Sequence, residues 1–204
     1  MGAIFYLMGK SSTGKDTIYK TLLSDKELNL KRIIPYTTRP IREGEENGIE
    51  YIFTDEPGLQ ELIRKNVVIE QRSYDTFYGV WKYFTVFDGQ INLLCNNYIM
   101  IGTPDSFAAT QKYFGSSKII PILIELDDGI RLQRALDREK SQSNPKYEEM
   151  CRRFLTDSRD FSEEKIKEYR ISNCFANEDL KKCISDITSF IKKNIYYADS
   201  NNVN

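Results

Sequence analysis

The chain of 204 residues contains no histidine, and this absence removes several catalytic arrangements at once. Ser-His-Asp triads and Cys-His pairs are both excluded. There are only four cysteines, and none forms a CxxC pair, so we expect reduced thiols without a catalytic role. The cysteines are Cys95, Cys151, Cys174 and Cys183.

Long apolar runs and an excess of charge of one sign are missing as well. The chain has 29 basic and 30 acidic residues, and its net charge of −1 provides no bulk attraction to nucleic acid or to a membrane surface. No secretory signal and no run of membrane-spanning length is found. We therefore expect a cytoplasmic protein of one domain that binds neither nucleic acid nor membranes, as a monomer or homodimer.

The first seventeen residues carry the most specific motif. Residues 4–8 form an apolar run of strand length, and Gly-x4-Gly-Lys follows at residues 9–15. In this setting the backbone N–H groups form a nest for phosphate, which the positive end of the following helix reinforces. The motif predicts a P-loop that binds ATP, with Lys15 at the β- and γ-phosphates. The predicted ATP-binding residues are Gly9, Ser11, Ser12, Thr13, Gly14, Lys15, Asp16 and Thr17.

One position departs from the usual P-loop pattern. The residue after the lysine normally carries a hydroxyl that binds Mg²⁺, and here it is Asp16, followed by Thr17. A carboxylate is a good Mg²⁺ ligand, usually through water. We therefore expect Asp16 or Thr17 to hold the Mg²⁺ that accompanies ATP.

The rest of the chain alternates between strand and helix signals. Helices are predicted at residues 15–23, 57–65, 130–137, 146–168 and 180–193. Extended segments are predicted at residues 32–36, 50–53, 67–70 and 77–80, and further apolar runs lie at 91–94, 98–101 and 119–126. Buried apolar runs separated by helical segments favour an α/β fold with parallel strands and crossover helices.

A second group of residues points to an acceptor phosphate. Arg39 and Arg42 lie three residues apart, before two glycine turns and Tyr51 on an extended segment. Guanidinium groups capture phosphate through paired hydrogen bonds, and a tyrosine hydroxyl can donate another. A donor phosphate site and an acceptor phosphate site in one chain indicate phosphoryl transfer.

These residues carry a resemblance to the guanylate kinase family. It rests on the P-loop, the Thr-Thr-Arg-x-x-Arg-x-Gly-Glu-x-x-Gly-x-x-Tyr-x-Phe segment at 37–53, Glu70, Tyr78-Gly79 and Ile171-Ser172-Asn173. The resemblance implies a P-loop NTPase core with a parallel sheet flanked by helices, at about 1–34, 80–128 and 169–196. It also implies a small β-rich acceptor-binding insert at about 35–79, a helical lid at about 129–168 and a disordered tail at 197–204.

The resemblance also implies an activity, the transfer of phosphate from Mg-ATP to GMP, and roles for particular residues. Arg39, Arg42, Tyr51 and Tyr78 would hold the GMP phosphate, and Glu70 would accept hydrogen bonds from N1 and N2 of guanine. Lys15 and the lid residues Arg134, Arg138 and Arg153 would stabilise the transferring phosphate. Arg152 is an alternative to Arg153, and Asn173 would lie beside adenine.

Three departures from the family pattern concern the guanine base. Pro35 and Val80 stand where the family commonly has hydroxyl side chains, and residues 100–105 lack the acidic pattern usual there. Lost hydrogen-bonding groups predict weaker selection of GMP over AMP. Two alternatives stay open: a kinase similar to the ribose bisphosphate phosphokinases, and a catalytically silent binding module, against which the presence of Lys15 argues.

Overall fold

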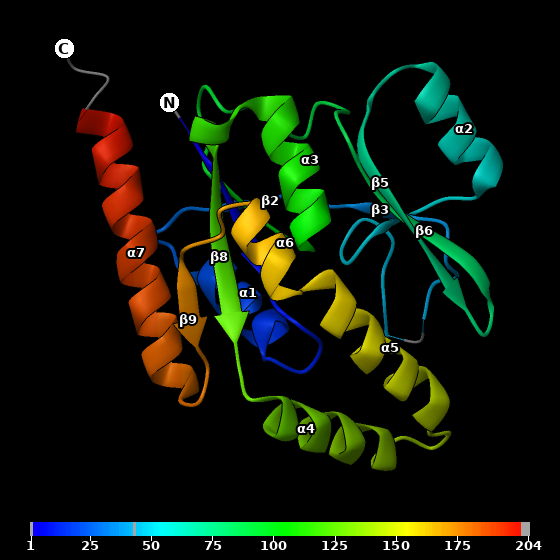
Figure 1. Cartoon of the computed structure of the whole chain (residues 1–204). Helices are drawn as coiled ribbons and strands as arrows, with labels where there is room; N and C mark the ends of the chain where they lie inside the picture. The colour runs from blue at the N-terminus through cyan, green and yellow to red at the C-terminus, as the bar shows by residue number, and fades with distance from the viewer. Residues whose placement is uncertain (1, 43, 201–204) are drawn as a thin grey trace.

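The structure is a computed structural model that describes residues 2–42 and 44–200, and a parallel sheet forms its centre (Figure 1). The strand order is β2 (Lys31–Arg32), β7 (Tyr98–Gly102), β1 (Ile4–Met8), β8 (Ile119–Glu125) and β9 (Cys174–Ala176). Every adjacent pair is parallel. Because β1 is the middle strand, all five of its residues are buried, and its carboxyl end delivers the chain to the P-loop.

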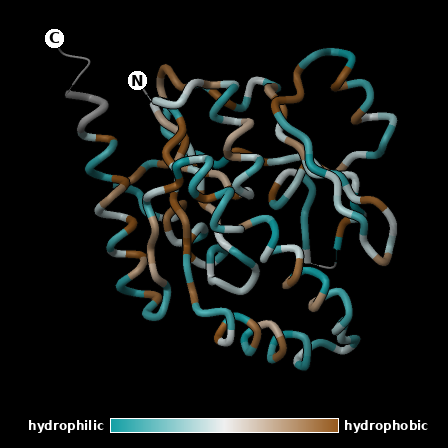
Figure 2. The backbone as a smooth tube through the Cα atoms, viewed as in Figure 1, coloured by the Kyte–Doolittle hydropathy of each residue, from teal (hydrophilic) through white to brown (hydrophobic). Residues whose placement is uncertain are grey.

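Helices cover both faces of this sheet, as the alternation of side chains along β1 requires. Phe5 and Leu7 pack with α1 (Lys15–Ser24) and α7 (Leu180–Ser200). Tyr6 and Met8 point to the other face, where α3 (Pro104–Phe114) and α6 (Glu163–Glu168) lie. Apolar residues follow the central strands, and the outer helices are largely hydrophilic (Figure 2).

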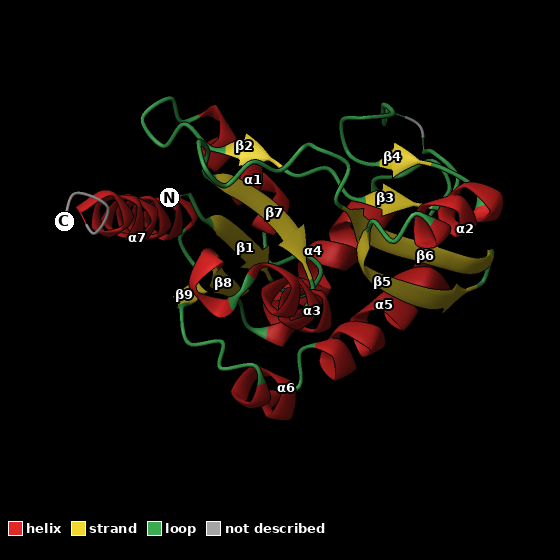
Figure 3. Cartoon of the chain, turned by 90° about the horizontal axis from the view of Figure 1, so that it is seen from above, coloured by secondary structure: helices red, strands yellow, loops and turns green. Residues whose placement is uncertain are grey.

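A second, mostly antiparallel sheet lies beside the first (Figure 3). Its order is β4 (Ile52–Phe53), β3 (Tyr36–Thr37), β6 (Gly79–Val86) and β5 (Val68–Thr76). The helix α2 (Glu56–Arg64) packs Leu59 against Phe84 and Val86. Strands β5 and β6 form a hairpin whose turn is Phe77–Tyr78, and Gly79 starts β6 with a φ of 105°.

Two further helices follow β8. The first, α4 (Asp128–Lys140), begins at Asp127, whose carboxylate accepts a hydrogen bond from the N–H of Ile130. The second, α5 (Tyr147–Asp160), crosses below the hairpin in Figure 1 and returns the chain to the core at α6. A single 3₁₀ turn, Ser116–Lys118, joins α3 to β8. In the described part of the chain, no helix is long and apolar enough to cross a membrane.

The predicted α/β fold with a parallel sheet between helices is confirmed, and individual elements differ from the prediction. Residues 77–78 form a turn, and the run at 91–94 leads into a turn that meets the N-terminal segment. The predicted helix over 146–168 is interrupted at 161–162, where Ser162 caps α6. Helix α7 extends over 197–200 of the predicted tail at 197–204, and the remaining residues of that tail lie outside the described residues.

Candidate active site

The P-loop connects the end of β1 to the start of α1, and its backbone curves so that its N–H groups lie on the inside of the loop. Gly14 has a φ of 89°, and Ser12 has a φ of 64°. The side chain of Asn177 donates a hydrogen bond of 2.6 Å to the Thr13 carbonyl. A Cβ atom on Gly14 would lie 2.4 Å from that same amide nitrogen, so only glycine fits both the backbone angle and the contact.

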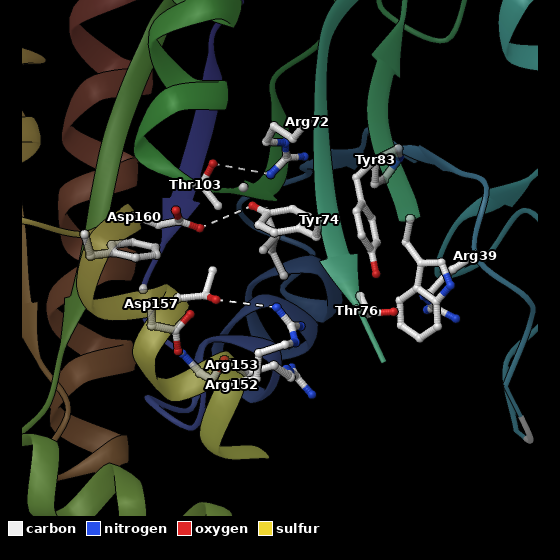
Figure 4. A pocket seen from close by; sticks show the side chains of 18 of the residues that line it. Arg39, Arg72, Tyr74, Thr76, Tyr83, Thr103, Arg152, Arg153, Asp157 and Asp160 are labelled. Carbon is white, nitrogen blue, oxygen red and sulfur yellow. Dashed lines mark hydrogen bonds between the residues drawn. The ribbon is translucent and has the colours of Figure 1, made fainter. Parts of the chain in front are cut away.

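A cavity of about 240 Å³ opens between the P-loop, the second sheet and α5 (Figure 4). Its walls combine many cations with aromatic rings and a few carboxylates. The cations are Lys15, Arg39, Arg42, Arg72, Arg152 and Arg153; the aromatic residues are Tyr51, Tyr74, Trp81, Tyr83 and Phe161; and the carboxylates are Glu149, Asp157 and Asp160. Such a wall suits an anionic ligand that also has a flat apolar part.

Arg39 is the most firmly held of these cations. Its guanidinium donates hydrogen bonds of 2.7 and 2.6 Å to the two carboxylate oxygens of Glu45. It also lies 4.9 Å from the centre of the Tyr51 ring and 5.2 Å from that of Phe53. Burial alone would lower the pKa of Arg39, but the bond to Glu45 offsets this effect and the pKa is raised. Arg39 is therefore a fixed cation.

Arg42 is in a different electrostatic state. Its pKa is lowered, first by burial and then by the nearby charges of Arg39 and Arg153. Since Arg39 has a resident carboxylate, the positive charge in excess belongs to Arg42 and Arg153. An anion bound between these two side chains would relieve their repulsion.

The β5–β6 hairpin presents one face to the cavity. Arg72 lies opposite Tyr83, and Tyr74 lies opposite Trp81. Directly opposed residues of an antiparallel pair point to the same side, so these four side chains share a face, together with Thr76. Figure 4 shows Arg72 and Tyr74 on neighbouring parts of the wall, above Arg152 and Arg153.

Helix α5 adds two arginines that differ in their partners. Arg152 makes two hydrogen bonds of 2.7 Å to Glu149. Arg153 lines the same cavity and, among residues 2–42 and 44–200, forms no ion pair. Arg153 is therefore the arginine of this pair that can still bind an anion.

Comparisons with known proteins find similarity to guanylate kinases. The guanylate kinase family model matches residues 2–83. The guanylate kinase of Mycoplasma mobile is 26% identical over 196 residues, covering 96% of this chain and 94% of that protein. The guanylate kinase of Malacoplasma penetrans is 28% identical over 184 residues, covering 87% of this chain and 82% of that protein. That of Syntrophomonas wolfei is 38% identical over 87 residues, covering 42% and 44% of the two chains. The chain is similar to guanylate kinases over nearly its whole length.

The fold agrees with this similarity. The crystal structure of guanylate kinase from Anaplasma phagocytophilum superimposes with a TM-score of 0.64 at 16% identity, and covers 94% of this chain and 85% of that chain. An identity this low supports a shared fold and nothing further. These similarities support a nucleotide-binding phosphotransferase of the nucleoside monophosphate kinase type, with a P-loop that binds ATP.

Several residues expected at the guanylate kinase acceptor site lie outside the cavity. Tyr78 and Val80 stand at the tip of the hairpin and are 56% and 55% exposed. The ring of Tyr78 stacks on Trp81 with 6.0 Å between ring centres, and the ammonium of Lys146 lies 4.8 Å from the centre of the Tyr78 ring. Val80 lies opposite Asp75, so strand alternation places it on the other face of the hairpin from Tyr74 and Trp81. The roles of Tyr78 and Val80 toward GMP stay predictions.

Glu70 is held below the cavity surface. Its side chain is only 3% exposed and accepts hydrogen bonds of 3.1 and 3.4 Å from Arg72 and of 2.7 Å from the Thr85 hydroxyl. The Arg72 side chain, not that of Glu70, forms the cavity wall here. Arg72 was missed at the sequence level, although its spacing of two from Glu70 on a strand placed both on one face.

The arginines expected in the lid differ in where the structure places them. Arg134 and Arg138 are exposed on α4 and lie outside the cavity wall. Arg131 of the same helix is completely buried instead, and it donates a hydrogen bond of 2.9 Å to the carbonyl of Ser11 in the P-loop. Arg131 also pairs with Asp128 at 2.7 Å and covers the ring of Phe154. The three-residue spacing could not tell which of these arginines faces the P-loop.

The asparagine beside the P-loop is Asn177. Asn173 lies at the opposite end of β9, where its amide donates a hydrogen bond of 3.0 Å to the carbonyl of Pro121. Because parallel strands end at the same edge of the sheet, a residue that follows β9 reaches the P-loop and one that precedes it does not. The role of Asn173 beside adenine stays a prediction, and the structure adds Asn177 as the asparagine that contacts the P-loop.

The residues expected to bind Mg²⁺ fit that ion by their chemistry. Asp16 and Thr17 are exposed in the first turn of α1, directly after Lys15. Within the described part of the chain, no three acidic or cysteine side chains gather into a metal cage. One carboxylate plus water and phosphate oxygens is a common Mg²⁺ arrangement in kinases, so a dedicated cage is not needed.

Proposed function

We propose that this protein transfers the γ-phosphoryl group of Mg-ATP directly to the phosphate of GMP, giving ADP and GDP. One observation carries the proposal: Lys15 of the P-loop and the cations Arg39, Arg42 and Arg153 line a single cavity. A donor phosphate and an acceptor phosphate can therefore meet in one space without a protein nucleophile between them.

The donor side of the cavity supports ATP binding. The buried hydroxyl of Ser12 and the side-chain oxygen of Asn177 have no hydrogen-bond partner among the described residues. Both belong to the P-loop or contact it, where a bound nucleotide or its water would satisfy them. A second cavity of about 390 Å³ adjoins Lys10 and Thr13 at the carboxyl end of β8 and offers room for the donor nucleoside.

The acceptor side supports a phosphate monoester. Its phosphate would bind between Arg42 and Arg153, whose mutual repulsion favours an anion, with Arg39 adjoining as a fixed charge. The acceptor phosphate is already ionised at neutral pH, so no general base is required. Lys15 and Arg153 would neutralise the charge that develops on the transferring group. When bound, Mg²⁺ would shield the negative charge of the triphosphate, and Asp16 would help to hold it.

A second candidate is phosphorylation of a sugar bisphosphate. It is favoured by Arg72, an additional cation in the wall that could hold a second phosphate. The aromatic side chains of the cavity wall favour a flat base instead, since a sugar phosphate has no planar surface to stack on these rings. A catalytically silent binding module would not require Lys15 in the cavity wall.

A coupled ADP-release assay tests the proposal. Mg-ATP is offered with GMP, AMP, UMP, CMP or ribose 1,5-bisphosphate, and hydrolysis without an acceptor is subtracted. We expect GMP to give the fastest turnover. Strong turnover with the sugar bisphosphate and none with GMP would replace the first proposal by the second.

A further inference from the structure

The guanidinium of Arg72 is fixed along one edge and available along the other. Its Nε donates to one Glu70 oxygen at 3.1 Å, and Nη2 faces the other oxygen at 3.4 Å. Nη1 lies 3.4 Å from the Thr103 hydroxyl, a long contact (Figure 4). The edge formed by Nη1 and Nη2 therefore keeps N–H groups that can bind a ligand in the cavity. Burial would lower the pKa of Arg72, but Glu70 offsets this effect and the pKa is raised, so the cation is permanent.

Aromatic side chains lie next to the Nη1–Nη2 edge of Arg72 in the cavity wall. Tyr74 and Tyr83 meet edge to face at 5.8 Å between ring centres, and Tyr51 meets Tyr83 at 5.6 Å. Aromatic walls of this kind accept a planar base by stacking or edge contact. The hydroxyl of Tyr74 points to Asp160 at 3.3 Å, so its ring is held in place.

A guanidinium edge beside aromatic rings matches a base that presents two adjacent hydrogen-bond acceptors. Guanine offers O6 and N7 in this arrangement, and an arginine that contacts both is the commonest specific contact with guanine in nucleic-acid complexes. Adenine has N7 but replaces O6 by an amino group, which is a donor and would face the arginine's own N–H groups. Hypoxanthine has the same O6 and N7 as guanine and lacks only the 2-amino group.

We infer that Arg72 is the base-reading residue of the acceptor cavity, and that the cavity accepts 6-oxopurine nucleoside monophosphates, IMP as well as GMP. The inference rests on the proposed function. Glu70, the carboxylate that could recognise the 2-amino group, is covered by Arg72 and bonded to Thr85. The 2-amino group therefore has no dedicated partner, while O6 and N7 have Arg72. Pro35 and Val80 lack the hydroxyl groups that would donate hydrogen bonds to the base, and Arg72 supplies such donors from strand β5.

The first test needs no variant. We expect kcat/KM of the unmodified protein for GMP and IMP to agree within about 10-fold, and that for AMP to be lower by about 10- to 100-fold, as one arginine–base pair gives. If GMP is phosphorylated and kcat/KM for IMP is more than about 100-fold lower than that for GMP, the inference is overturned, because the site would then recognise the 2-amino group. The proposed function would stay intact. No turnover of GMP or IMP would refute the proposed function itself.

The second test uses Arg72→Lys, which keeps the charge opposite Glu70 and removes the paired donors. We expect kcat/KM to fall about 10-fold or more for both GMP and IMP. The ratio of these values to kcat/KM for AMP should become smaller, and the KM for ATP should not change. Val80→Ser on the same hairpin and Arg64→Lys on the exposed face of α2 are the controls, and neither should change these ratios. Unchanged base selectivity in Arg72→Lys would overturn the assignment.

Discussion

A carboxylate oxygen of Asp157 accepts a hydrogen bond of 2.7 Å from the backbone N–H of Ser11 in the P-loop. The same oxygen lies 3.6 Å from Arg131, which also holds the carbonyl of Ser11. An anion from α5 thus occupies one of the N–H groups that a P-loop offers to phosphate. Binding of ATP in this arrangement requires the carboxylate to yield that N–H group or to share it with a phosphate oxygen.

This contact leads to a prediction for Asp157→Asn. The neutral amide is a weaker acceptor and does not repel the triphosphate, so we expect the Kd for Mg-ATP to fall by about 3- to 10-fold, the equivalent of one hydrogen bond. Isothermal titration calorimetry measures it. Glu148→Gln, an exposed carboxylate on the same helix, is the control and should leave the Kd unchanged. A weaker affinity for ATP in Asp157→Asn would mean that the carboxylate assists binding.

Lys15 is expected to be required for transfer but not for folding. It lines the cavity with its ammonium, and no ion pair involving it is found in the described part of the chain. Lys15→Met should lower kcat by about 100-fold or more, as loss of a transition-state charge partner does. Thermal unfolding should stay within a few degrees of the unmodified protein. Normal turnover in this variant would contradict the P-loop assignment.

The two α5 arginines should respond differently to the same substitution. Arg153→Met removes a cation without a carboxylate partner, and we expect kcat to fall by about 100-fold with little change in stability. Arg152→Met leaves Glu149 without its partner, so we expect a loss of stability and a smaller effect on kcat. Steady-state kinetics and urea denaturation on both variants provide the comparison. A larger loss of kcat in Arg152→Met than in Arg153→Met would mean that Arg152 is the arginine that stabilises the transferring phosphate.

The ion pair of Arg39 and Glu45 should make stability depend on pH. The bond from Arg39 lowers the pKa of Glu45 in the folded protein. The ionised carboxylate therefore stabilises the fold above its unfolded pKa of about 4.3, and this contribution disappears as the pH falls through the lower folded value. Glu45→Gln should reduce the free energy of unfolding by ~1–3 kcal/mol at neutral pH, with a difference that shrinks below about pH 4.

Urea denaturation at pH 7, 5 and 3.5 measures this dependence. Glu61→Gln on the exposed face of α2 is the matched control, because its partner Lys65 is exposed as well. A difference between Glu45→Gln and the unmodified protein that stays constant with pH would show that the charge of Glu45 does not contribute.

The sequence predicted the parts of the fold that depend on local pattern. The P-loop, the buried run of β1 and the amphipathic α7 follow from spacing and periodicity within one segment. The helix α3 was missed, although Thr103 and Ser106 form a capping box at its start. Pro104, at the first helical position, is a further signal of a helix start at this point.

The site was harder to predict wherever it depended on register. Arg131, Arg134 and Arg138 have similar spacing, and only the packing of α4 on Phe154 and the P-loop selects Arg131. Asn177 lies beside the P-loop because it follows the end of β9. Arg72 faces the cavity because side chains alternate along β5. Tyr78 lies in a two-residue turn, which local propensity does not predict strongly because Phe and Tyr are unusual there. Val80 lies on the opposite face of the hairpin from Trp81 because side chains alternate along a strand.

Direct transfer of phosphate between two nucleotides in one cavity is tested most directly by a label-transfer experiment. The protein is incubated with ATP labelled in the γ-phosphate and unlabelled GMP in the presence of Mg²⁺, and the products are separated by chromatography. We expect the label in the β-phosphate of GDP, no labelled protein, and no transfer in Lys15→Met. Label recovered only as free phosphate, or on the protein, would contradict the claim.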